Sequence, residues 1–132
     1  MAVFFEMTPN EAILLLRFEG KISRKEILAT AECASDYIRF TRRHYAIIDA
    51  SLQTITADDH DTAVYWYGGL SQLPAGCRIA YVPPIASAPS RAKLISRAAA
   101  DNGHRLLVYE CINEATEWIR FEYDRAETIA AE

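Results

Sequence analysis

Cysteine is scarce in this chain, and its scarcity argues against two common ways of stabilising a small protein. The 132 residues contain three cysteines, Cys33, Cys77 and Cys111. Their number is odd, their spacing is wide and no Cys-x-x-Cys pair occurs, so the sequence predicts neither a disulfide framework nor a zinc site. We expect all three to be small core residues of a protein in a reducing cytoplasm.

Glycine is scarce too, and the five glycines form no motif that cradles a phosphate group. The sequence contains neither a glycine-rich phosphate loop nor the Gly-x-Ser-x-Gly elbow of many hydrolases. We therefore expect no cofactor. An enzyme remains an alternative, because catalytic groups from distant parts of a chain can meet in the fold.

An excess of positive charge is also missing. The formal net charge is −4, so no global field would attract a nucleic-acid backbone. Residues 1–6 lack the basic start and long apolar stretch of a signal peptide, and no window approaches the roughly 20 apolar residues of a membrane span. We expect a cytoplasmic protein with no nucleic-acid partner and no membrane span.

The composition is that of an ordinary globular protein. Hydrophobic residues make up 51% of the chain and charged residues 24%, which argues against disorder. The length suits one domain with a sizeable core. We assign residues 1–123 to that domain and residues 124–132 to a peripheral C-terminal tail.

The predicted fold is organised around residues 45–51, an apolar run that turns polar at its end, as a central buried strand does. Residues 3–7 and 12–19 form a predicted β-hairpin across a turn at Thr8–Glu11. Further strands are expected at residues 77–82 and 104–109. Helices are expected at residues 24–40, at about 57–73, from near Pro89 to Asn102, and from near Ile112.

Local signals mark the ends of the predicted helices. Ser23 and Glu26 form a capping box before the first helix, and residues 56–59 repeat the pattern before the second. The pair Gly68 and Gly69 weakens or ends that second helix. Ser87 or Ala88 caps the third, and Gly103 is its left-handed terminator. The order β-β-α-β-α-β-α-β-α predicts an α/β fold, a mostly parallel sheet with an antiparallel edge hairpin and covering helices.

Several segments together resemble the SpoIIAA-like branch of the STAS superfamily. They are Gly20-Lys21-Ile22-Ser23, Ala46-Ile47-Ile48-Asp49, Arg78-Ile79-Ala80-Tyr81-Val82, and Leu107-Val108-Tyr109 followed by Glu114-Ala115-Thr116-Glu117-Trp118-Ile119. The resemblance covers nearly the whole chain. It implies a helix-covered sheet of four or five strands and a role in protein interaction or small-ligand sensing.

The same resemblance raises the possibility of a phosphorylation switch. In the anti-sigma-factor antagonists of the superfamily, a serine in an Asp-Ser-x-Gly-like segment at the next helix start is phosphorylated. Here Asp49 matches the strand end, but residues 55–58 read Ile-Thr-Ala-Asp, and Ser51 and Thr56 are the nearby hydroxyls. A switch at Ser51 or Thr56 is our third hypothesis. Cys111 also departs from the capping Asp, Ser or Thr more usual in this branch.

A candidate ligand-binding rim lies where the strands are predicted to end. Ligands of open α/β sheets gather at the carboxyl ends of the strands, and helix starts favour anions. Residues 53–61 mark this edge together with Asp49 and Ser51, and the candidate residues are Asp49, Ser51, Thr56, Ser87, Ser90 and Arg91. Our leading hypothesis is a non-enzymatic module that binds a protein partner or a small anionic ligand there. Simple capping of the third helix is the alternative for its serines.

The second hypothesis is a small hydrolase or transferase that uses the same rim. Asp49 or His60 would serve as the base beside Ser51. Residues 58–61, Asp-Asp-His-Asp, also invite a metal site, but only Asp58 and Asp61 would share a helix face, so we expect an acidic first turn instead. We expect the isolated histidines, His44 and His104, at the surface or its boundary.

Three adjacent aromatic residues, Tyr65, Trp66 and Tyr67, are the candidate interface. They cannot all face one core from a helix, so at least one should be exposed. Tyrosine and tryptophan are favoured at interfaces, so either core packing or a homodimer or partner contact could account for them. The cluster Arg39, Arg42 and Arg43 is expected to complement the dipole of the first helix, and a partner-binding basic patch is the alternative.

Overall fold

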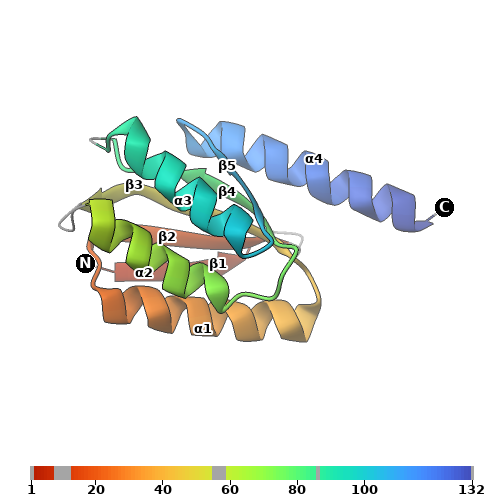
Figure 1. The fold of residues 1–132 in the computed structure, drawn as a ribbon. Helices are drawn as coiled ribbons and strands as arrows, with labels where there is room; N and C mark the ends of the chain where they lie inside the picture. The colour runs from red at the N-terminus through yellow and green to blue at the C-terminus, as the bar shows by residue number, and fades with distance from the viewer. Residues whose placement is uncertain (1, 8–12, 55–58, 86, 132) are drawn as a thin grey trace.

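The computed structural model describes residues 2–7, 13–54, 59–85 and 87–131, and shows an α/β fold (Figure 1). Its elements follow in the order β1 Ala2–Met7, β2 Leu14–Lys21, α1 Arg24–Thr41, β3 Tyr45–Thr54, α2 Asp59–Ser71, β4 Arg78–Val82, α3 Pro89–Asp101, β5 Arg105–Val108 and α4 Ile112–Ala131. The turn predicted at Thr8–Glu11 and the capping residues 56–58 lie outside the described residues. None of the helices in the described part of the chain is long and apolar enough to cross a membrane.

The five strands form one sheet in the order β1-β2-β3-β4-β5. β1 is antiparallel to β2, and every other neighbouring pair is parallel. This confirms the mostly parallel sheet with an antiparallel edge hairpin, and it confirms β3 as the central strand. The parallel strands therefore end together at one edge, which is where β3 and β4 lead toward α2 and α3.

The helices cover the two faces of the sheet unequally, and the chain order explains why. Right-handed crossovers between strands added one after another place every connecting helix on the same face. Accordingly α1, α2 and α3 lie on one face, whereas α4, which follows the last strand, lies on the other (Figure 1). The end of α4 projects beyond the sheet (Figure 1), and its residues 124–130, predicted as a peripheral tail, are mostly exposed.

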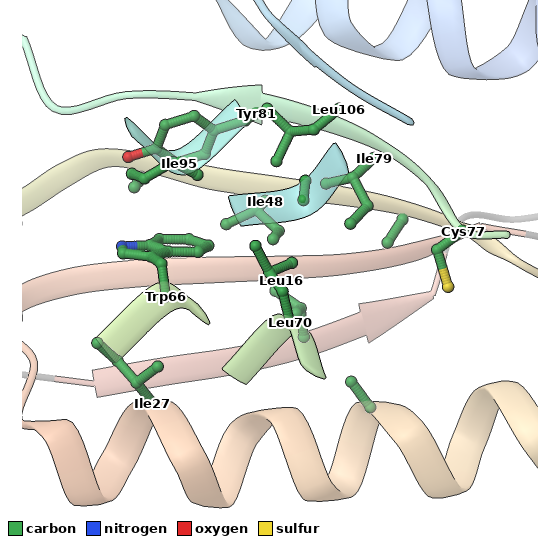
Figure 2. Close-up of a cluster of buried hydrophobic side chains, with 14 of the residues drawn as sticks. Leu16, Ile27, Ile48, Trp66, Leu70, Cys77, Ile79, Tyr81, Ile95 and Leu106 are labelled. Carbon is green, nitrogen blue, oxygen red and sulfur yellow. The ribbon is translucent and has the colours of Figure 1, made fainter. Parts of the chain in front are cut away.

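The larger core lies beneath α1, α2 and α3. Figure 2 shows Trp66 of α2 between Ile27 of α1 and the strand residues, with Tyr81 of β4 nearby. The Trp66 ring meets the Tyr81 ring edge to face, with centroids 5.3 Å apart. A smaller core between the sheet and α4 includes Ile47 and Ile119, both almost fully buried. Strand alternation thus divides β3 between the two cores.

Local capping begins α1 as the sequence predicts. The Ser23 hydroxyl accepts a hydrogen bond from the backbone N–H of Glu26, and the Glu26 carboxylate accepts one from the backbone N–H of Ser23, each 3.1 Å long. The helix ends at Arg42, whose φ of 58° is left-handed. Gly103, after α3, also has a left-handed φ of 79°, as predicted.

The double glycine does not end α2, which continues through it to Ser71. A Cβ atom added to Gly68 would lie 3.3 Å from Leu28 Cδ2, and one added to Gly69 would lie 3.4 Å from Ile27 Cγ2. Both contacts are with α1. The possibility that the glycines end the helix was therefore wrong, because the missing side chains let two helices approach closely.

Two of the three cysteines are exposed, contrary to the prediction. Cys33 and Cys111 lie at the surface, and only Cys77 is buried. A helix presents some positions to solvent whatever their polarity, so apolar composition alone misplaces Cys33 on α1. Burial raises the pKa of the Cys77 thiol to about 11, which keeps it protonated near neutral pH.

The difference in burial predicts different thiol reactivity. At pH 8 a thiol reagent such as dithionitrobenzoate should modify Cys33 and Cys111 rapidly and Cys77 slowly, because the reactive species is the exposed thiolate. Absorbance should report two rapid equivalents in the folded protein and three in denaturant. Three rapid equivalents in the folded protein would contradict the burial of Cys77.

His104 is buried, which corrects its predicted place at the surface, whereas His44 is half-buried at the boundary. The Nδ1 atom of His104 accepts a hydrogen bond of 3.3 Å from the backbone N–H of Cys77. The other nitrogen, Nε2, therefore carries the proton and donates to the Leu70 carbonyl oxygen at 2.9 Å. The ring of His104, just before β5, thus links α2 to Cys77, just before β4.

Candidate functional site

A small pocket lies at the sheet edge where β3 and β4 end. Its volume is about 40 Å³. It is lined by Ile22, Ile27, Gln53, Thr54, Thr62, Tyr65, Trp66, Tyr81, Pro84, Ser87, Arg91 and Ile95. These residues come from β3, β4, helices α1, α2 and α3, and the segments that follow β2 and β4, so the pocket exists only because the fold brings those parts together.

Arg91 is the charged residue of this pocket. It lies in the first turn of α3, which begins at Pro89 after the N-cap Ala88. Its Nη1 atom donates a hydrogen bond of 2.7 Å to the hydroxyl of Thr62, a buried residue of α2. That bond holds the guanidinium at the pocket wall. The same first turn presents the positive end of the α3 dipole, which favours an anion.

Tyr81 supplies a second donor. It lies on β4 and is almost fully buried, with its ring against Trp66. Burial raises the pKa of the Tyr81 phenol well above its ordinary value, although the charge of Arg91 lowers it in part. The phenol therefore stays protonated and can donate a hydrogen bond.

The structure brings together only part of the predicted rim. Ser87 and Arg91 line the pocket, whereas Ser90 is exposed and is not part of its lining. Ser87 does not cap α3, because Ala88 is the N-cap residue and no side chain bonds there. Thr56 lies outside the described residues.

Asp49 and Ser51 lie on the opposite face of the sheet from the pocket. Side chains alternate along a strand, and Ile48 and Ala50 between them belong to the larger core beneath α1, α2 and α3. Asp49 Oδ1 accepts hydrogen bonds from the Ser51 hydroxyl at 2.7 Å and from its backbone N–H at 3.1 Å. The polar groups of Asp49 and Ser51 are therefore hydrogen-bonded to each other. Neither residue lines the pocket.

The candidate interface residues have three different environments. Trp66 is buried, Tyr65 is half-buried in the pocket wall, and Tyr67 is 48% exposed. This confirms that at least one of the three aromatics is exposed. Self-association through this segment stays a prediction, in which Tyr67 and the exposed Val64, three residues earlier on α2, would make the contact.

Four polar residues of the pocket were not predicted as site residues. Gln53 and Thr54 belong to the segment predicted to mark this edge, although neither was among the six candidate residues. Nothing in the neighbouring sequence marks Thr62 or Tyr81 as a site residue, since each fits an ordinary helix or strand. Only the packing of α2 and α3 on the sheet makes them neighbours of Arg91.

The acidic run at residues 58–61, which was considered as a metal site, lies largely outside the described residues. Asp58 and the side chains of Asp59 and His60 are not described, so their part in a metal site or in catalysis stays untested. Within the described ranges, no three His, Cys, Asp or Glu side chains are grouped so that they could hold a metal ion.

No protein-family model matches this chain, and no curated protein matches its sequence. The likeness to the SpoIIAA-like branch therefore stays a prediction, and function must be argued from the pocket. Its described lining offers a guanidinium, hydroxyls and an amide, but no carboxylate and no imidazole. These groups can donate hydrogen bonds to an anionic oxygen or a carbonyl oxygen. The described lining lacks the carboxylate or imidazole that usually serves as a general base.

Proposed function

We propose that this chain is a non-enzymatic binding module of the SpoIIAA-like type, which takes a small anionic ligand in the pocket between β3, β4, α2 and α3. The observation that carries the proposal is the Arg91 guanidinium, held at 2.7 Å by the Thr62 hydroxyl in a pocket that it shares with the protonated Tyr81 phenol. A fixed cation beside neutral donors recognises a carboxylate or a phosphate group.

The size of the pocket limits the ligand. A volume of about 40 Å³ holds roughly three water-sized groups, since one water needs about 10–15 Å³. A carboxylate or phosphate end group fits such a space, and a whole nucleotide does not. The apolar wall formed by Ile22, Ile27 and Ile95 leaves the polar end of the ligand to Arg91.

Binding is favoured over catalysis by the protonation states in the pocket. A hydrolase or transferase needs a group that accepts a proton near neutral pH. The raised pKa of Tyr81 makes it a donor, and the Asp49–Ser51 pair belongs to the other face of the sheet. The phosphorylation switch at Ser51 or Thr56 remains a further hypothesis, which a phosphosite map of the native protein would test.

Replacing Arg91 by glutamine should weaken anion binding about tenfold or more, because the shorter, neutral side chain loses a charge-assisted hydrogen bond. Acetate and inorganic phosphate are suitable probes, with expected dissociation constants on the order of millimolar. Titrations should follow the Trp66 indole and Thr62 amide resonances by nuclear magnetic resonance, since both residues line the pocket.

The matched control is Arg97→Gln, which removes an exposed charge from the same helix. It should change the dissociation constants by less than about twofold. If neither anion shifts the two resonances, or if Arg91→Gln and Arg97→Gln behave alike, the pocket is not an anion site and the proposal fails.

A further inference from the structure

A second charged feature lies at the opposite edge of the sheet, where β4 and β5 begin beneath α4. Glu122 of α4 is only 4% exposed there. Its carboxylate contacts Arg125 Nη2 at 2.7 Å, Arg105 Nη1 at 3.5 Å and Arg78 Nε at 3.7 Å. A buried carboxylate requires compensating partners, and three guanidiniums supply them.

A fourth arginine extends this cluster. Arg43, just after α1, donates a hydrogen bond of 2.5 Å from Nη1 to the Tyr123 hydroxyl. We call Arg43, Arg78, Arg105 and Arg125 the arginine edge. The charge of Glu127 also acts on Arg43, and Glu122 pairs with the other three guanidiniums. Four guanidiniums thus gather in one part of a chain whose formal net charge is −4.

The arginine edge has more hydrogen-bond donors than Glu122 can use. One carboxylate accepts about four hydrogen bonds, whereas the three guanidiniums around it have roughly fifteen N–H groups. The side chains of Arg105 and Arg125 are 59% and 51% exposed, so donors that do not reach Glu122 face solvent. The Nε of Arg78 is buried and has no hydrogen-bond partner among the described residues.

Aromatic rings hold the exposed guanidiniums in place. Arg105 lies over Trp118 and Arg125 over Phe121, each 5.9 Å from the ring centroid. Arg43 lies 5.6 Å from the centroid of Tyr123. Side chains fixed in this way lose less conformational entropy when they bind a partner. The donors are therefore arranged before any partner arrives.

We propose that the arginine edge is a docking site for an acidic protein segment, whose Asp and Glu carboxylates would pair with the exposed guanidiniums. Opposite charge and the planar geometry of the ring-held guanidinium groups favour bidentate hydrogen bonds to carboxylates. Single-stranded nucleic acid is a poorer fit. Its bases need free aromatic faces, but the Trp118 ring already contacts Arg105 and Tyr109. The formal net charge of −4 also disfavours a phosphate backbone.

The site is separate from the anion pocket, so the two proposals stand independently. The pocket lies at the carboxyl ends of β3 and β4, whereas Arg78 and Arg105 lie at the amino ends of β4 and β5. Failure of acetate and phosphate to bind at Arg91 would leave the arginine edge unaffected.

The experiment uses a fluorescent octaglutamate peptide and the full chain at low salt, with binding followed by anisotropy. Octaglutamate should bind, and the double variant Arg43→Gln/Arg105→Gln should weaken its binding about fivefold or more, because two charge contacts are lost. The control Lys93→Gln/Arg97→Gln removes the same charge from exposed positions on α3 and should change affinity by less than about twofold.

A third variant, Glu122→Gln, acts in the opposite direction. It keeps the shape of the buried side chain but removes the carboxylate that competes for the three guanidiniums. Octaglutamate should therefore bind about twofold to fivefold more tightly. This variant tests whether the arginine edge binds the acidic peptide even if circular dichroism shows that the arginine double variant is unfolded.

Three outcomes would overturn the proposal. Octaglutamate could fail to bind, the two double variants could lose affinity equally, or an octathymidine probe could bind more tightly than octaglutamate. The second would mean that overall charge alone governs binding. The third would assign the edge to nucleic acid instead.

Discussion

Replacing Trp66 by alanine is expected to lower the free energy of unfolding by about 3–5 kcal/mol. The indole is only 6% exposed, and its ring lies within 6.1 Å of the Phe18 centroid and 5.3 Å of the Tyr81 centroid. It fills the space between α1 and the sheet in Figure 2. Loss of so large a buried group costs both its transfer from water and the cavity that remains.

The adjacent Tyr67 provides a matched control, because it is 48% exposed on the same helix. Tyr67→Ala should change the free energy of unfolding by less than about 1 kcal/mol. Urea denaturation followed by circular dichroism measures both variants. Equal losses for the two variants would contradict the assignment of Trp66 to the core.

Trp66 also connects the core with the proposed anion pocket. Together with Ile27 it lines both that pocket and a second, apolar cavity of about 40 Å³ bounded by Leu16, Ala34 and other core residues. Truncation of the indole should therefore join the two spaces, and anion binding should weaken in Trp66→Ala even at temperatures where the variant is folded. Trp66→Phe keeps most of the volume and should retain binding.

His104→Ala should lower the free energy of unfolding by about 2–4 kcal/mol. The substitution removes the hydrogen-bond partner of the Cys77 N–H and one of two partners of the Leu70 carbonyl, which also accepts from the Leu73 N–H at 3.3 Å. An unsatisfied buried backbone group costs roughly 1–3 kcal/mol, and the lost ring leaves a cavity in addition.

His44→Ala is the corresponding control, since His44 is half-buried before β3. Its effect should stay below about 1 kcal/mol. Thermal and urea unfolding of the two variants should separate them clearly, with an unchanged denaturant slope in both. If His104→Ala were no more destabilising than His44→Ala, the buried hydrogen bonds of His104 would not contribute as the structure indicates.

The site was only partly predictable, and the residues show why. Arg91 was found because a proline, serines and an arginine at a helix start are a local pattern that signals an anion-favouring position. Asp49 and Ser51 were chosen because ligands of α/β sheets gather at the carboxyl ends of the strands. That rule predicts the edge of the sheet at which a residue lies, but not the face. The burial of Ile48 and Ala50 puts both on the other side from Arg91.

Buried polar residues were the least predictable feature. Glu122 and His104 read as ordinary surface residues in the sequence, because charged and imidazole side chains are usually exposed. Their burial depends on partners that are distant along the chain, such as Arg78 and Arg105 for Glu122, or Leu70 and Cys77 for His104. No local signal records such a pairing.

The sequence by itself determined the order of helices and strands, the hairpin edge, the central strand and the capping of α1, because hydrophobic periodicity and turn residues act over a few neighbouring positions. Only the tertiary structure decided which face each strand residue occupies, how closely Gly68 and Gly69 bring α2 to α1, and which polar groups meet. Those properties arise from contacts between elements far apart in the chain, where burial and partner geometry outweigh local preference.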